Sequence, residues 1–325
     1  MPEAALGPAL CTVEVGSEPS VAVLPEGRLA LTVPGESGVL VLDSQCSTVA
    51  EMGRFGAGPG EYRVAARAFV DIAGGLHVLD PVLQRITHYS ASGEHLGATA
   101  VTDGPSVESL MMASDGAVFS IAPLTDVDDS VSLVVHRALD VSEGIELARL
   151  HRPLPVLVPL GETAINTPPE YTPFDAWGTL PGGEAWVARG ADNRLERIRG
   201  GSRASGPPVP FARIETVPAD RDRWRGLPAP ENFRVSSRPL SPVKAPFQGV
   251  VRAEDGEYWM WLNQPAGHSS ERYACRTLDS GELLRVTLPN AHKVLALGPD
   301  RVYVYGEDGD GTPMLSAHAR PRCAP

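Results

Sequence analysis

The side chains best suited to chemistry in this sequence are carboxylates, amides and aromatic rings that lie far apart along the chain. No GxSxG nucleophile pattern occurs, and the glycine-rich run 56–60 is followed by neither a lysine nor a helix, which argues against a phosphate-binding loop. The eight histidines form no HxH or HxxxH pair, so no zinc motif is expected. Any site must therefore be assembled from distant segments.

The remaining candidates combine aromatic faces with carboxylates and amides, the groups that a concave site for a small molecule or peptide uses. We expect a ligand site on one rim of the fold, formed by Glu61, Tyr62, Asp80, Arg85, Tyr171, Trp177, Asp192, Asn193, Arg194, Trp224, Trp261 and Asn263. In an alternative, a divalent cation such as calcium is the cofactor and binds Glu61, Asp80, Asp192 and Asn263. In a purely structural alternative, Trp177, Trp259 and Trp261 pack between neighbouring elements, and Asp80 braces a loop with Arg85.

A repeated pattern indicates which elements would position these residues. A pair of turn residues followed by an alternating apolar run occurs six times, with equivalent turn positions at 27, 74, 116, 183, 256 and 300. Each unit predicts a β-hairpin. The separations are 47, 42, 67, 73 and 44 residues, and three of them match one four-stranded propeller blade. Counting from 300 through the C-terminus to position 27 gives 52 residues, again one blade.

The sequence therefore predicts an all-β fold, a six-bladed β-propeller that forms a single domain over residues 1–325. The N-terminal strand Leu10 to Val15 is expected to close the last blade beside Met314 to Ala319, which removes an exposed sheet edge. In the second blade we expect strands at 68–72, 76–79, 85–89 and 95–101.

Two proline-rich insertions account for the long separations. They span about 152–173 and 204–246, and each is expected to follow the outer strand of one blade. Long ordered loops on a rigid scaffold commonly carry binding sites, so we expect both to wall the same rim of the central channel. The alternative is that they are solvated linkers.

Two segments resemble the NHL-like six-bladed propeller proteins of bacteria. The first is FGAGPGEY at 55–62 with the blade that follows, and the second is Thr216 to Leu262, which includes PADRDRW at 218–224 and DGEYW at 255–259. Pro299 and Asp300 depart from the family pattern, in which glycine is usual. The resemblance implies a propeller fold. It also implies an exported or lipid-anchored protein, in a group whose relatives include lactonases, lyases and interaction modules.

The four cysteines are far apart and form no CxxC pair. In the ring, Cys11 begins the closing strand and Cys323 is expected to end its neighbour, so we predict a disulfide between Cys11 and Cys323 that staples the ring shut. The alternatives are a Cys11–Cys46 bond or four free thiols, and the pairing of Cys46 and Cys275 stays open.

Charge narrows the class of partner. The formal net charge is −12 and the isoelectric point is near 5.1, which disfavours nucleic acid and anionic membrane surfaces. No apolar run is long enough for a membrane span, and residues 1–10 show no leader pattern. We expect a monomeric binding protein, periplasmic or extracellular in its mature form, that takes a small molecule, peptide or glycan. A cytoplasmic location and a metal-dependent lactonase or lyase activity are the alternatives.

Overall fold

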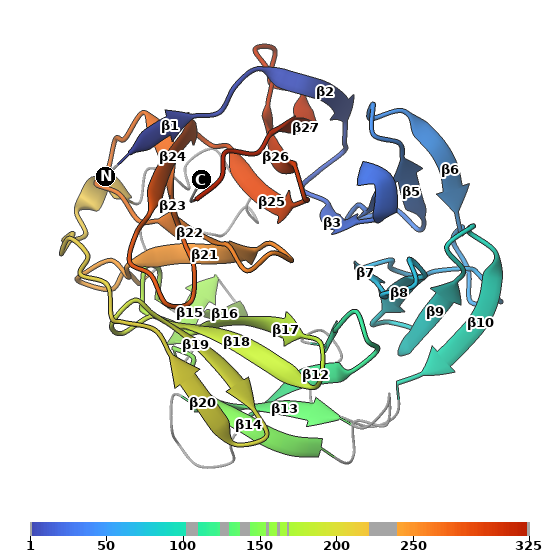
Figure 1. Ribbon diagram of the computed structural model, residues 1–325, viewed down its shortest axis with the longest axis horizontal. Coiled ribbons are helices and arrows are strands. Elements are labelled where there is room, and N and C mark those ends of the chain that lie inside the picture. The colour runs from blue at the N-terminus through green and yellow to red at the C-terminus, as the bar shows by residue number, and fades with distance from the viewer. Residues whose placement is uncertain are drawn as a thin grey trace.

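The computed structural model is built almost entirely of β-strands, and six small sheets surround a central axis (Figure 1). It describes residues 2–101, 110–123, 130–136, 144–153, 156–160, 163–167, 169–220 and 239–323. The protein is a six-bladed β-propeller, as the sequence predicts. The sheets are numbered here as blades 1 to 6 in chain order.

Each blade is a four-stranded antiparallel meander, and its first strand lies nearest the axis. Blade 1 contains β3 (Ser20–Val23), β4 (Leu29–Thr32), β5 (Val39–Leu42) and β6 (Thr48–Met52). Blade 2 contains β7 (Arg67–Val70), β8 (Leu76–Asp80), β9 (Arg85–Tyr89) and β10 (His95–Ala100). Blade 3 contains β11 (Met111–Met112), β12 (Val118–Pro123), β13 (Ser130–His136) and β14 (Gly144–His151). Blade 4 contains β17 (Ala176–Leu180), β18 (Glu184–Arg189), β19 (Arg194–Arg199) and β20 (Ser202–Ser205). Blade 5 contains β21 (Phe247–Arg252), β22 (Tyr258–Leu262), β23 (Ser270–Arg276) and β24 (Leu284–Pro289). Blade 6 contains β25 (Lys293–Leu297), β26 (Arg301–Glu307), β27 (Pro313–Ala319) and β2 (Ala9–Glu14).

The six repeated turn positions all lie between the first and second strands of a blade. Glycines at 27, 74, 116, 183 and 256 have positive φ, between 68° and 91°, a backbone conformation that residues with a Cβ rarely adopt. Because side chains alternate along the strands that follow, one face of each blade packs on the previous blade and the other face on the next. The core is therefore a ring of interfaces between blades, such as the cluster that joins Ala30 and Val41 of blade 1 to Leu76 and Val78 of blade 2.

The N-terminal segment closes the ring. Strand β2 runs antiparallel to β27, with Thr12 opposite Ser316, so the prediction of a shared last blade is confirmed. The sequence analysis missed a further strand, β1 (Glu3–Ala5), which adds to the outer edge of blade 5 in parallel with β24 (Figure 1). The N-terminal segment thus pairs with two adjacent blades.

The predicted Cys11–Cys323 disulfide is wrong. Cys11 is bonded to Cys46, the alternative pairing, and Cys275 is bonded to Cys323. Strand β27 ends at Ala319, so Cys323 lies beyond the strand pair, where the chain has crossed to blade 5. Cys11 instead packs with the cluster between blades 6 and 1 that contains Cys46.

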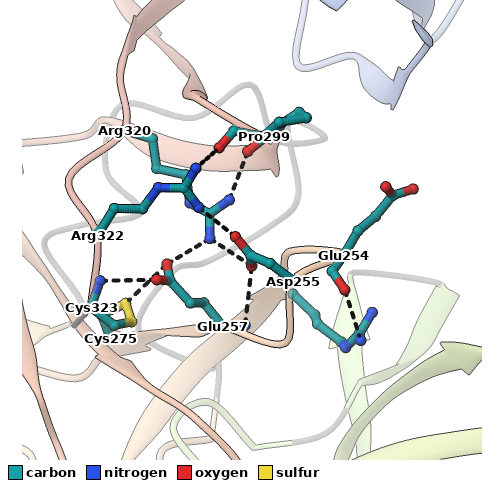
Figure 2. A network of polar contacts seen from close by, with 10 residues as sticks. Glu254, Asp255, Glu257, Cys275, Pro299, Arg320, Arg322 and Cys323 are labelled. Carbon is teal, nitrogen blue, oxygen red and sulfur yellow. Dashed lines mark hydrogen bonds and ion pairs between the residues drawn. A yellow bond between two sulfur atoms is a disulfide. The ribbon is translucent and has the colours of Figure 1, made fainter. Parts of the chain in front are cut away.

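A buried ion-pair network fixes the C-terminal tail to blade 5 (Figure 2). The Arg320 guanidinium donates to Asp255 Oδ1 at 2.9 Å and to Glu257 Oε2 at 2.5 Å, and its side chain is only 1% exposed. Glu257 also accepts the backbone N–H of Cys323 at 3.0 Å, and Arg322 pairs with Asp255 at 2.5 Å. The tail is therefore held by two arginines as well as by a disulfide.

Both insertions follow the outer strand of a blade. The first, between β14 and β17, contains the hairpin of β15 (Val156–Leu160) and β16 (Thr163–Thr167). The second, between β20 and β21, begins and ends side by side, because Glu215 bridges to Val243. The two insertions also bond to each other: Glu170 N–H donates to Pro239 O at 3.0 Å, and Ser241 N–H donates to Glu170 O at 2.8 Å.

Among the described residues, no helix is sufficiently long and apolar to cross a membrane.

Candidate functional site

Glu61 and Arg85 brace the glycine-rich loop between blades 1 and 2. Glu61 accepts the Gly58 N–H at 2.8 Å and pairs with Arg54 at 2.9 Å, and these contacts hold the pKa of the Glu61 carboxyl below its usual value. Arg85 donates to the carbonyl oxygens of Ala57, Gly58 and Glu61. Both side chains stabilise the loop through these bonds.

Asp80 and Tyr62 are buried in blade 2. The Asp80 carboxylate accepts four backbone N–H groups, from Arg63, Val64, Val82 and Leu83, at 2.7–3.2 Å. Tyr62 is completely buried, and its hydroxyl bonds that of Tyr89 at 2.9 Å; burial is the main cause that raises its pKa above the usual range. Loop bracing by Asp80 therefore uses backbone amides, without an ion pair to Arg85.

Of the residues predicted in blade 4, only Asn193 shares a cavity with another predicted residue, since it lines a cavity of about 290 Å³ together with Asn263. Trp177 packs against the cluster between blades 3 and 4, and Asp192 pairs with Arg194 at 2.6 Å on the exposed turn. Asn193 occupies the left-handed turn position with φ of 55°, and its carbonyl oxygen accepts Arg276 Nη1 at 2.6 Å. Burial lowers the pKa of Arg276 to about 10. Trp224 lies outside the described residues.

The structure does bring together Tyr171, Trp261 and Asn263, which line a cavity of about 370 Å³ on the insertion-bearing rim. The other walls come from the end of β14, the first insertion and the start of β21, at Arg152, Pro153, Pro169, Glu170, Thr172, Phe174, Ala245, Phe247 and Gln248. Tyr171, Gln248 and Asn263 also line an adjoining cavity of about 470 Å³ over the turn of blade 5. These two cavities are called the rim pocket below.

Tyr171 is held in an unfavourable backbone conformation. Its φ is 63°, and its carbonyl oxygen accepts the Ala245 N–H at 2.8 Å from the other insertion. A residue with a side chain persists there only when surrounding contacts impose it, and such residues cluster at ligand-binding sites. The cross-insertion bond therefore fixes the ring of Tyr171 in the pocket wall.

A buried ion pair supports that ring from beneath. Lys244 Nζ pairs with Asp220 Oδ1, and both side chains are 2% exposed. Lys244 also donates to Gln264 O at 2.7 Å, and its ammonium lies 4.5 Å from the centre of the Tyr171 ring, within the range of a cation–π contact. Because the two charges compensate each other, this wall of the pocket carries no net charge.

Trp261 is fixed on its far side by blade 5. Its ring stacks on Tyr273 at 6.2 Å between centroids, and its indole N–H donates to Glu271 Oε2 at 2.9 Å. His268 Nε2 and the Ala291 N–H also lie within bonding distance of Glu271, at 3.3 Å and 3.4 Å. The indole therefore lines the pocket as a preorganised apolar surface.

Two polar groups of the pocket wall have no partner in the described part of the chain. The side chain of Asn263 donates to Ala245 O at 2.9 Å, whereas its Oδ1 accepts no bond although the residue is 7% exposed. Nε of the half-buried Arg152 is likewise unpaired. A buried acceptor without a donor destabilises the fold by about 1–3 kcal/mol. A hydrogen bond from an N–H or O–H group of a ligand, or from a water molecule, would remove this cost.

The four residues of the cation alternative do not come together. Glu61, Asp80 and Asp192 make the contacts given above, on blades 2 and 4, and only Asn263 lines the rim pocket. Across the described residues, one group of three ligand-type side chains converges, namely Glu257, Cys275 and Cys323, and its two sulfurs form a disulfide. That group is thus a structural contact of the C-terminal tail.

The sequence analysis missed Lys244 and its partner Asp220, although a compositional signal was present. The chain has 28 basic residues, but its only lysines are Lys244 and Lys293. Both stand over an aromatic ring of the pocket, since Lys293 Nζ lies 5.8 Å from the centre of the Trp261 ring.

Comparisons with known proteins agree on the fold. No protein-family model and no curated protein matches the chain. Among solved structures, a Bacteroides fragilis protein described as exported aligns with a TM-score of 0.54 and 12% identity, covering 95% of this chain and 94% of its own. The PQQ-bound aldose sugar dehydrogenase of Streptomyces coelicolor gives 0.48 and 12% over 97% of both chains. Virginiamycin B lyase from Staphylococcus aureus gives 0.45 and 9%, over 95% and 98%. The chain is thus similar in fold to a protein described as exported.

Proposed function

We propose that this protein is an exported, monomeric binding propeller that holds a small, neutral, polar ligand, such as a sugar unit, in the rim pocket. The observation that carries the proposal is the unpaired Oδ1 of Asn263, a buried acceptor in the wall of a cavity that Tyr171 and Trp261 also line. A ligand hydroxyl or N–H would satisfy it, while a flat apolar face would lie against an aromatic ring.

The dimensions of the pocket favour this ligand class. A volume of about 370 Å³ falls in the range of small-molecule sites. The charges of Lys244 and Asp220 compensate each other, and Glu271 accepts a hydrogen bond from the Trp261 indole. These groups therefore do not select for a charged ligand. The two disulfides support an oxidising compartment, periplasmic or extracellular.

A binding panel tests the proposal. Purified protein is titrated calorimetrically with mono- and disaccharides and, in parallel, with neutral tripeptides. We expect at least one saccharide to bind saturably, and we expect Asn263→Ala and Tyr171→Ala each to weaken that binding about ten-fold, because each loses one contact of the pocket.

Asp192→Ala is the matched control, since Asp192 lies in an exposed turn of blade 4 outside the rim pocket and pairs with Arg194. Saccharide binding that neither pocket variant weakens would refute the assignment to this pocket, and binding confined to the peptides would replace the ligand class. Chemical conversion of a bound saccharide or its lactone would favour the lactonase or lyase alternative.

A further inference from the structure

A third cavity lies between blade 5 and the second insertion. It is the cavity of about 290 Å³ that Asn193 and Asn263 line. One wall comes from β22, β23 and β24 of blade 5, and another from residues 209–214 of the insertion. The cavity shares Ala245, Asn263 and Gln264 with the rim pocket, but it shares none of the charged residues. Its electrostatics are therefore its own.

Three arginines of this cavity stand on one face of blade 5. Arg272 and Arg276 lie four residues apart on β23, so they point to the same side of the strand. Arg285 of β24 lies opposite Ala274, the residue midway between them. Glu282 is the only carboxylate among the described lining residues. This wall is therefore positive, although the chain has a formal net charge of −12.

Arg276 is a buried cation whose partners are neutral. The residue is 1% exposed, and its guanidinium bonds Asn193 O at 2.6 Å and, at 3.4 Å, Asn193 Oδ1, Pro207 O and Ser280 O. It pairs with no carboxylate in the described part of the chain, and its Nε has no partner there. Burial of an uncompensated charge destabilises a fold, and the same burial lowers the pKa of Arg276. An anion in the cavity would compensate this charge.

Arg272 and Arg285 differ in their partners. Arg285 pairs with Glu282 at 2.9 Å and lies 3.7 Å from Glu3, so its charge is compensated. Arg272 is exposed, and it makes no ion pair or side-chain hydrogen bond with any residue that the structure describes. A guanidinium presents a planar fork of N–H groups that matches the two oxygens of a carboxylate. Arg272 is therefore the side chain of this cavity that can bind an anionic group directly.

The other walls of the cavity are mostly apolar. They include Val209, Pro210, Phe211, Ile214, Met260 and Leu262. Phe211 is 40% exposed, so an apolar ligand surface would remove part of its ring from water. The cavity volume of about 290 Å³ lies at the lower end of the range for small-molecule sites. A ligand that suits these walls combines a negative charge with a small apolar body.

We propose that this cavity binds a small organic monocarboxylate with an aromatic or branched aliphatic body. Arg272 holds the carboxylate, and the apolar body packs against side chains such as Phe211 and Met260. Arg276 acts as a positioning residue, because its buried charge favours a ligand of opposite sign without contact. Sulfate and phosphate suit the cavity less well, since its apolar walls offer them no hydrogen-bond donors.

Calorimetric titration of the wild-type protein with benzoate, phenylacetate and isovalerate tests the site, with the amide of each acid as its neutral match and sulfate as the inorganic anion. We expect at least one carboxylate to bind with a stoichiometry of one, and its amide to bind at least about ten-fold more weakly. Added sodium chloride should weaken carboxylate binding, because it screens the attraction of the arginines.

Variants locate the binding in this cavity. Arg272→Gln should weaken it about ten-fold, and Arg272→Lys should weaken it less, because lysine keeps the charge and loses the fork. Phe211→Ala should also weaken it through the loss of apolar contact. Arg149→Gln is the matched control, since Arg149 is an exposed arginine of blade 3 that pairs with Glu146 outside the cavity.

Equal affinity of the wild-type protein for each carboxylate and its amide would overturn the proposal, and this result does not depend on whether any variant folds. The same conclusion would follow if no carboxylate bound at millimolar concentration, or if Arg272→Gln left the affinity unchanged. Sulfate that bound more tightly than every carboxylate would also overturn it, because the site would then select inorganic anions.

Discussion

At the scale of single residues, the Lys244–Asp220 pair sets the stability of the pocket wall. Both side chains are 2% exposed, so removal of one charge leaves the other buried without compensation. We expect Lys244→Met to lower the free energy of unfolding by about 3 kcal/mol, and the double variant Lys244→Met/Asp220→Leu to recover most of that loss. Denaturation in guanidinium chloride measures both.

Lys293→Met provides the comparison for that experiment. Its ion pair with Glu18 is 38% and 46% exposed on its two sides, and pairs of this kind contribute less than about 1 kcal/mol. Equal losses for Lys244→Met and Lys293→Met would show that burial does not govern the Lys244 pair.

Protonation of Asp255 below about pH 4 should weaken the attachment of the C-terminal tail to blade 5. Burial raises the pKa of Asp255, but the hydrogen bond and charge of Arg320 lower it more, and the net pKa lies below its ordinary value. A carboxylate with a depressed pKa stabilises the fold above the pKa of the unfolded chain, about 3.9, and this contribution is lost as the pH falls further.

We therefore expect the difference in unfolding free energy between the wild type and Asp255→Asn to be constant from pH 7 to about 5 and to shrink below about 4. Urea unfolding at pH 7, 5, 4 and 3 measures it. Other acidic groups titrate in both proteins and cancel in the difference. A gap that stays constant down to pH 3 contradicts the role given to the charge of Asp255.

At the scale of elements, β1 protects the outer edge of blade 5. It pairs with Arg285, Val286 and Thr287 of β24, and Ala4 and Leu6 pack on the core cluster of that blade. We expect deletion of residues 2–6 to lower the unfolding free energy by about 2 kcal/mol and to promote self-association through the exposed edge. Denaturation and size-exclusion chromatography measure the two effects.

The control for this deletion is a chain that lacks residues 2–15 and so loses β2 as well. It should lose the closed ring, because β27 would have no partner at its outer edge. If the shorter deletion were as damaging as the longer one, β1 and β2 would not have the separate roles assigned here.

These two strands also illustrate how far elements can be predicted from sequence. The alternating residues of β2 and the glycine turns of each blade carry a local signal, and the strands predicted for blade 2 lie within two residues of those observed. Strand β1 is only Glu-Ala-Ala, without alternation or β-branched residues. Strand β1 forms because it pairs with the edge of β24, so its own residues carry no signal that predicts a strand.

At the scale of the whole molecule, the two disulfides should stabilise the ring by similar amounts. They close loops with sequence separations of 35 and 48 residues, for which chain entropy predicts about 4 kcal/mol each. We expect Cys11→Ala/Cys46→Ala and Cys275→Ala/Cys323→Ala each to reduce the unfolding free energy by up to that amount. In each double variant, peptide mapping without reductant checks that the one remaining disulfide joins the expected cysteines.

The two disulfides lie in different core clusters, so we expect the two losses to add in the quadruple variant. A Cys11–Cys323 link found by mapping would contradict the connectivity described here. Full stability in the quadruple variant would show that the ring needs neither bond.

The site was less predictable than the ring, for a physical reason. The repeat period fixes the number of blades and the closure, and these follow from counting. Whether a carboxylate lines a channel or accepts backbone N–H groups depends on loop geometry, as Asp80 shows with its four amides. Lys244 and Asp220 meet only because two proline-rich segments fold back on each other.

The pairing of Glu3 with Arg285 and of Thr12 with Ser316 imposes an order on biogenesis. Strands β1 and β2 leave the ribosome long before their partners β24 and β27, with a delay on the order of tens of seconds at ordinary rates of translation. Until then the ring stays open and Cys275 has no Cys323 to bond, whereas Cys11 and Cys46 are both already present. A chain that is secreted in an unfolded state benefits from such a delay, because its ring cannot close before β27 has been delivered.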